Sequence, residues 1–143
     1  MIHIRGLDHI VLRTRKLDAM LEFYQQHLNL SLERCEADAG LYQLRAGTSL
    51  IDIVPVDSPL GRAGGDPPDH QRHNVDHFCL QVAGFKADAL LAYCAEHGIE
   101  HSSVERRYGA EGFGLSLYIT DPEGNIIELK GPAEPGTRLD VRL

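Results

Sequence analysis

The chain has 143 residues, of which 43% are hydrophobic and 24% are charged. Chains of this size and composition fold as one or two compact units and bury about 70% of their unfolded surface, which excludes disordered and fibrous proteins. The formal net charge of −7, from 21 acidic and 14 basic residues, argues against binding to the phosphate backbone of nucleic acids.

No apolar run approaches the roughly 20 residues that a membrane-spanning helix needs, so we expect no membrane partner. Residues 1–8 lack the apolar stretch and cleavage site of a signal peptide, and we therefore expect a cytoplasmic protein. Cys35, Cys79 and Cys94 are odd in number and widely spaced. This pattern predicts small core residues rather than disulfides or a zinc ribbon.

In chain order, the first half is expected to form a strand, a helix and three further strands. The helix is predicted from apolar residues spaced three and four apart, and the strands from short apolar runs bounded by turn residues. The predicted ranges are 7–12, 17–28, 28–32, 41–45 and 50–54.

The second half repeats this βαβββ order, because residues 75–80 resemble residues 7–12 at an offset of 68. Gly98 predicts the end of the second helix. The predicted ranges are 75–80, 87–94, 99–104, 115–120 and 126–130.

The proline- and glycine-rich residues 55–74 predict a linker, and residues 131–143 predict a tail. Each repeat, about 5–55 and 73–131, is too small for a comfortable core of its own. We therefore predict that residues 1–143 form a single domain made of two repeats.

Strand alternation divides each predicted strand into a core side and an open side. The open side carries His9 and Asp52 in the first half, and His77, Tyr118 and Glu128 in the second. The two histidines are equivalent positions of the repeat, and so are the two carboxylates. We expect all of these side chains to share one face.

Two imidazoles with one or two carboxylates suit a divalent cation such as Fe, Mn, Ni, Co or Zn, and leave coordination positions for substrate. We predict His9, His77 and Glu128 as metal ligands and Asp52 as a candidate fourth ligand. A single histidine in an alternating strand is usually solvent-facing. Equivalent histidines in two repeats, each with a carboxylate in the closing strand, favour a ligand set.

Four segments of the sequence resemble the vicinal oxygen chelate superfamily, which includes glyoxalase I, extradiol dioxygenases, and fosfomycin and bleomycin resistance proteins. These segments are residues 6–12, 23–24, 75–77 and 116–129. The resemblance implies an α+β fold in which two βαβββ repeats form curved mixed sheets around a central metal site. It also implies a homodimer.

The ligand positions of this superfamily match His9, His77 and Glu128. Its members bind substrate to the metal through two neighbouring oxygens, and the cation stabilises the negative charge that develops. The resemblance thus implies a metal-dependent glyoxalase- or dioxygenase-type enzyme that acts on a small oxygen-rich substrate. Asp52 falls at or near the position where glyoxalase I has a glutamate that serves as ligand and base, so we predict Asp52 to be catalytic. Its side chain is shorter than that of glutamate, which argues against glyoxalase I activity itself.

Further residues are predicted to contact substrate. Tyr118 precedes Glu128 by ten residues, a spacing that resembles an active-site tyrosine of the superfamily, and would donate a hydrogen bond to a substrate oxygen; packing of its ring is the alternative. Ser116 shares its face. Residues 106–114 contain three glycines and two arginines, which predict either a flexible lid that brings Arg106 or Arg107 to an anionic group or a plain hairpin loop. Of the two arginines, Arg107 is the predicted substrate residue.

Two other functions remain open. One is a thiol or water transferase of the fosfomycin resistance type, although residues 130–132 show no clear counterpart of the basic residues that bind phosphonate there. The other is a metal-free drug- or metabolite-binding protein of the bleomycin resistance type, which typically lacks the ligand set.

Overall fold

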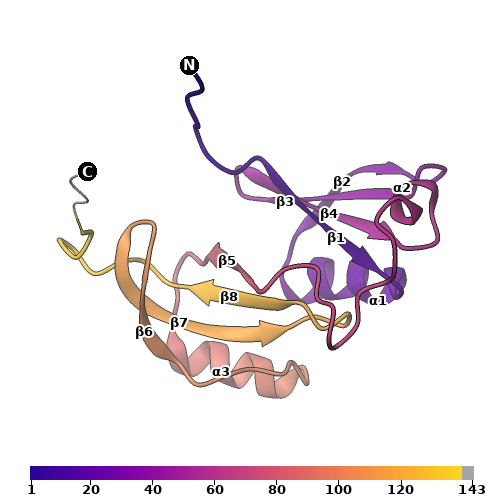
Figure 1. Cartoon of the computed structure of the whole chain (residues 1–143). Helices are drawn as coiled ribbons and strands as arrows, with labels where there is room; N and C mark the ends of the chain where they lie inside the picture. The colour runs from indigo at the N-terminus through magenta and orange to yellow at the C-terminus, as the bar shows by residue number, and fades with distance from the viewer. Residues whose placement is uncertain (140–143) are drawn as a thin grey trace. The chain divides into compact units, whose positions relative to one another are not determined.

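The computed structural model describes residues 1–139, which form two compact units. Unit 1 comprises Met1–Asn74 together with Pro122–Gly124, and unit 2 comprises Val75–Asp121 and the described residues from Asn125 onward. Each unit contains one four-stranded mixed sheet that is not closed into a barrel (Figure 1). The predicted α+β fold with two βαβββ repeats is therefore confirmed.

Unit 1 holds the first βαβββ repeat. Its sheet has the order β1-β4-β3-β2, with β1 parallel to β4 and the other pairs antiparallel. Its elements are β1 (His9–Thr14), α1 (Leu17–Glu22), the π-helical turn η1 (Phe23–His27), β2 (Ser31–Glu36), β3 (Leu41–Ala46), β4 (Ser49–Pro55) and α2 (Pro59–Arg62).

Unit 2 repeats the same topology. Its sheet has the order β5-β8-β7-β6, and β5 is parallel to β8 as β1 is to β4. Its elements are β5 (Phe78–Gln81), α3 (Ala87–Glu96), β6 (Glu105–Gly109), β7 (Gly112–Thr120) and β8 (Ile126–Lys130).

The core of each unit lies on the apolar side of its strands. In unit 2, α3 covers one face of the sheet, where Leu117, Ile119 and Ile127 are fully buried (Figure 1). In unit 1, Met20 and Tyr24 are completely buried one helical turn apart. The opposite face of each sheet carries the polar residues of alternating parity.

The end of α3 follows the sequence prediction. Gly98 has a φ of +63°, a left-handed conformation that favours glycine, and its N–H donates to the Ala95 carbonyl. The N–H of Ile99 donates to the Cys94 carbonyl at 2.9 Å, and both residues are buried. This Schellman arrangement ends the helix and returns the chain to the core.

The prediction for residues 99–114 is wrong in two places. Residues 99–104 contain only an isolated bridge between His101 and Ile119, and the strand β6 follows instead at Glu105–Gly109. The predicted lid or loop at 106–114 forms β6 and the start of β7, joined by a turn at residues 110–111. The glycines that suggested a loop lie within paired strands, and two of them, Gly109 and Gly114, leave room for a side chain described below.

Three smaller expectations also differ from the structure. The predicted strand at 28–32 lies at Ser31–Glu36, an edge strand whose residues are all exposed and therefore show no alternation. β5 begins at Phe78, one residue after His77. Only Cys94 is a core cysteine, because Cys35 and Cys79 are exposed.

Part of the predicted linker is held by one side chain. The Arg13 guanidinium on β1 donates to the carbonyls of Gly61, Gly64, Gly65 and Asp66 at 2.7–3.2 Å. These bonds order a glycine-rich segment that has little core of its own. None of the helices formed by residues 1–139 is long and apolar enough to cross a membrane.

Candidate metal centre

Unit 2 brings two of the predicted ligands together. Glu128 on β8 lies directly opposite Tyr118 on β7 and Cys79 on β5, and His77 precedes β5. The Nε2 of His77 is 3.7 Å from Oε2 of Glu128. This distance is too long for a hydrogen bond. Two ligands of one metal ion, each about 2.1 Å from it, lie roughly 3.0–3.4 Å apart, so a small side-chain adjustment would suffice.

Glu128 is 7% exposed, and its Oε1 is the buried side-chain oxygen or nitrogen that has no hydrogen-bond partner among residues 1–139. Native proteins satisfy the great majority of buried polar atoms, because an unpaired one has a substantial desolvation cost. An unpaired buried carboxylate oxygen next to an imidazole is a donor that can bind a cation. His77 and Glu128 therefore supply two donors of the types that divalent metals bind.

His77 is oriented for this role by its sequence neighbour. Its Nδ1 lies 2.6 Å from the Asp76 carboxylate, which accepts the Nδ1 proton. The tautomer with a proton on Nδ1 leaves the Nε2 lone pair on the side of Glu128. Carboxylate partners of this kind fix the ring orientation of metal-binding histidines. Sequence analysis missed Asp76, although the Asp-His pair occurs in both repeats.

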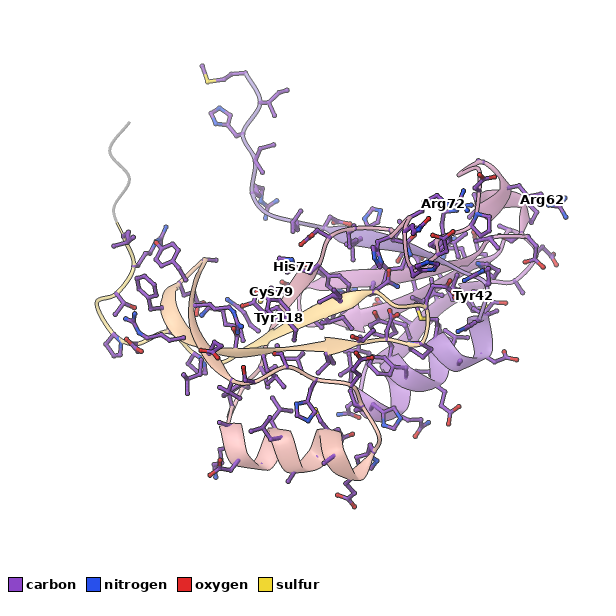
Figure 2. All side chains as sticks on the ribbon, turned by 60° about the horizontal axis from the view of Figure 1, so that its bottom comes forward. Tyr42, Arg62, Arg72, His77, Cys79 and Tyr118 are labelled. Atoms are coloured by element: carbon purple, nitrogen blue, oxygen red, sulfur yellow. The ribbon has the colours of Figure 1, made fainter. Side chains whose placement is uncertain are left out.

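Tyr118 links the ligand pair to a cation on β6. The Tyr118 ring packs edge-on against the His77 ring, with centroids 5.4 Å apart. The Arg107 guanidinium lies over the Tyr118 ring, 4.6 Å from its centroid. Figure 2 labels Cys79 and Tyr118 on the sheet of unit 2 and His77 just before β5. A cavity of about 400 Å³ borders this group, and its walls include Asp76, His77, Tyr118 and residues 100–102. Space for a small molecule thus adjoins the histidine.

Unit 1 contains the equivalent pair in a different state. The Nδ1–H of His9 donates to Asp8 at 2.7 Å, as His77 does to Asp76. The pKa of His9 is raised above 6.5, first by this hydrogen bond and then by the negative charge of Asp52. His9 is exposed.

Asp52 is 3% exposed, and both of its oxygens accept hydrogen bonds from the Gln43 amide at 3.2 Å. Gln43 lies directly opposite Asp52 on β3, as Tyr118 lies opposite Glu128. Sequence analysis missed Gln43. Its polar side chain between Tyr42 and Leu44 was the available signal, but its partner depends on strand register.

The predicted residues therefore form two pairs, one in each unit. His9 is near Asp52, and His77 is near Glu128. In the described part of the chain, no group of three or more His, Cys, Asp or Glu side chains is arranged to hold a metal ion. The four-residue ligand set stays a prediction.

The other predicted substrate residues lie on the same face of unit 2. Ser116 is fully buried, and its hydroxyl accepts a hydrogen bond from Nη1 of Arg107 at 3.0 Å. Cys79 was not predicted to act, and its chemistry is muted. Although the residue is exposed, neighbouring side chains shield its sulfur from water, and this desolvation, followed by the Glu128 charge, raises the pKa of the thiol to about 11.

The sequence was compared with those of known protein families. Residues 6–129 match the family model of the Glyoxalase/Bleomycin resistance protein/Dioxygenase superfamily. The chain belongs to this superfamily. A glyoxalase domain-containing protein, RDO1 of Mycosarcoma maydis, is 27% identical over 129 residues, which cover 90% of this chain and 69% of that protein.

Several solved structures share the fold of this chain. Virulence protein STM3117 from Salmonella typhimurium superposes with a TM-score of 0.72 at 22% identity, covering 91% of this chain and 98% of that one. A glyoxalase/bleomycin resistance protein/dioxygenase from Alicyclobacillus acidocaldarius gives a TM-score of 0.63 at 21% identity, with 94% and 96% covered. At these identities the likeness concerns the fold alone.

Proposed function

We propose that this glyoxalase superfamily member is a metal-dependent enzyme of the glyoxalase or dioxygenase type. Its substrate would be a small oxygen-rich molecule that binds the metal through neighbouring oxygens. The observation that carries the proposal is the buried, unpaired Oε1 of Glu128 beside a histidine whose Nδ1 is already held by Asp76. A purely structural carboxylate would have its oxygens satisfied.

The proposed ligands are His9, His77 and Glu128, with Asp52 as the fourth. They would meet at one cation either within a chain or across two copies in a homodimer. Asp8 and Asp76 would keep the two imidazoles in the Nδ1-protonated form. Each ring would then offer its Nε2 lone pair to the cation.

A bound divalent cation would act as a Lewis acid that stabilises negative charge on substrate oxygens. The protein's own groups would do the rest. The Tyr118 hydroxyl would donate a hydrogen bond to a substrate oxygen, and Asp52 would accept a proton once Gln43 yields one of its hydrogen bonds. Ser116 and Arg107 would contact the substrate beyond Tyr118.

Elemental analysis after anaerobic purification and mild metal reconstitution tests the proposal. We expect one equivalent of a divalent metal in the wild type, its loss in His77→Ala, and its retention in the control His73→Ala, which alters an exposed linker histidine. Circular dichroism would verify that the variants fold.

The identity of the metal would refine the reaction type. Iron would favour dioxygen chemistry on a catechol-like substrate, whereas nickel, cobalt, zinc or manganese would favour isomerase, lyase or transferase chemistry. A wild-type protein that takes up no metal under any of these conditions would contradict the proposal. That result would favour a metal-free binding protein instead.

A further inference from the structure

Lys130, the last residue of β8, is a buried charge that the proposed metal ligands do not use. It is 6% exposed and lies on the same face as Glu128, two residues away. Its Nζ donates to the Arg107 carbonyl at 2.7 Å. An ammonium group has three donors, so one carbonyl leaves its hydrogen-bonding capacity only partly used.

Two glycines make room for this side chain. A Cβ at Gly109 would lie 2.6 Å from Cε of Lys130, and a Cβ at Gly114 would lie 3.2 Å from its Nζ. Both glycines are in paired strands, where a glycine often marks a close approach by another group. The lysine therefore lies in a slot across β6 and β7.

Arg107, whose backbone carbonyl accepts the hydrogen bond from Lys130, contributes a second positive charge from the neighbouring strand β6. Its Nη1 donates to the carbonyl and the hydroxyl of Ser116, and its guanidinium lies over the Tyr118 ring. These contacts fix the plane of the guanidinium. Its Nε and Nη2 form no hydrogen bond with any residue between 1 and 139. The fixed guanidinium thus retains donors for a ligand.

Neither cation forms an ion pair with a carboxylate of the described chain, although acidic residues outnumber basic ones. The pKa of Glu134 is lowered mainly by Arg106, which donates to both of its oxygens at 2.9 Å, and to a smaller extent by the charge of Lys130. Other arginines do have carboxylate partners. They are Arg15, Arg34, Arg45, Arg72 and Arg106.

A buried ammonium without a counter-ion is costly, whereas the same group paired with an anion is not. We propose that Lys130 and Arg107 form a binding site for an oxyanion, a carboxylate or phosphoryl group carried by a small molecule. Ser116 positions Arg107, and the slot formed by Gly109 and Gly114 positions Lys130. The site lies wholly in unit 2.

This site also defines the substrate class, an extension that rests on the proposed metal-dependent function. Glu128 and Lys130 are two residues apart on one face of β8, and the Cα atoms of residues so placed in a strand are about 6.5–7 Å apart. A small acid could therefore place its anionic group on the cations and its neighbouring oxygens toward Glu128. The substrate would be an oxygen-rich organic anion rather than a neutral molecule.

The test uses the full-length protein in metal-free form, so that anion binding is measured without the metal. Inorganic phosphate and acetate are titrated separately at constant ionic strength, with chloride as the background salt. The readout is the ¹H–¹⁵N shift of the Arg107 Nε–Hε group and of the Ser116 amide. We expect saturable binding in the millimolar range for at least one of the two anions. The tighter one identifies a phosphoryl or a carboxylate ligand.

Three variants are expected to weaken binding by about tenfold or more, since each removes or displaces a charge-assisted contact. Lys130→Met keeps the length of the side chain without its charge, Arg107→Gln removes the other cation, and Gly109→Ala keeps both charges but obstructs the slot. For Arg107→Gln, the Ser116 amide is the reporter. The control Arg106→Gln alters the neighbouring cation, which pairs with Glu134, and should change affinity less than twofold.

Absence of saturable binding by both anions, or equal affinity in the wild type and Lys130→Met, would overturn the anion site. Binding that survives in Arg107→Gln and Gly109→Ala would overturn it as well. Metal uptake is measured separately on the same variants and is expected to stay at the wild-type level. The anion site and the metal site can therefore fail independently.

Discussion

Each unit carries a histidine and a carboxylate at equivalent positions, but the two carboxylates differ in their hydrogen bonds. In unit 1, both oxygens of Asp52 are held by Gln43, whereas in unit 2 the Oε1 of Glu128 has no partner among the described residues. The strand register is the same, but the residue opposite the carboxylate is an amide in one unit and a tyrosine in the other. The repeat thus duplicates positions without duplicating their chemistry.

Because of this difference, the two carboxylates should contribute unequally to metal affinity. A carboxylate with an unpaired buried oxygen gains most from a cation, because binding removes an existing desolvation cost. A carboxylate already satisfied by an amide must exchange one partner for another. We therefore expect Glu128 to contribute more to metal affinity than Asp52.

The largest expected effect tests that inequality directly. Glu128→Gln should weaken metal binding by roughly 100-fold or more, while Asp52→Asn should weaken it by about tenfold or less. Both changes preserve side-chain size, and the measurement is competitive titration against a metal indicator. Equal losses in the two variants would show that the hydrogen bonds of Gln43 do not distinguish the sites.

A second, smaller effect concerns the aspartates that precede the histidines. Asp76→Asn and Asp8→Asn should each weaken metal binding by roughly 10-fold to 100-fold, since each leaves an imidazole less firmly oriented. Glu36→Gln, which changes an exposed carboxylate of β2, provides the control. Wild-type metal affinity in both variants would show that the Asp-His hydrogen bonds do not contribute to metal binding.

The same pairs predict a pH dependence at His9. In the metal-free protein, its pKa lies above 6.5 and should fall toward that value in Asp8→Asn, as followed by NMR titration of the ring. A raised pKa means that the folded state binds the proton more tightly than the unfolded state does. The pair therefore stabilises the fold below pH 6.5, and this contribution disappears as the pH rises through the raised pKa. A midpoint at or below 6.5 in the wild type would contradict the interaction.

The smallest effect is on the thiol beside Glu128. With a pKa of about 11, Cys79 has about 100-fold less thiolate near pH 8 than an ordinary cysteine, offset in part by the greater nucleophilicity of a more basic thiolate. Iodoacetamide should alkylate it roughly tenfold more slowly than free cysteine, as measured by mass spectrometry of the metal-free protein. In Glu128→Gln only part of the rate should return, because burial is the larger cause. Full recovery would show that charge dominates instead.

Much of the fold was predictable from the sequence because local signals carry it. Strand alternation located the open face, and Gly98 marked the end of α3. The sequence also placed His77 and Glu128 in one repeat, and the structure places Nε2 of His77 3.7 Å from Oε2 of Glu128. Period-two patterns are reliable wherever one face of a sheet is buried.

The parts that sequence analysis missed depend on which residues face each other across strands. Gln43 matters because it lies opposite Asp52, and Lys130 because Gly109 and Gly114 leave a slot for it. Neither relationship is visible along the chain. The glycines of β6 and β7 misled the prediction for a physical reason, since small residues serve both turns and close packing.

The hydrogen bonds of Arg13 have a practical consequence for engineering. The glycine and proline content of residues 55–74 makes this stretch look suited to an inserted tag or reporter. Yet four of its carbonyls converge on one guanidinium, so an added residue between Gly61 and Asp66 would move several acceptors out of reach at once. The exposed residues 37–38 offer a better point of attachment, because no side chain elsewhere in residues 1–139 hydrogen-bonds to them.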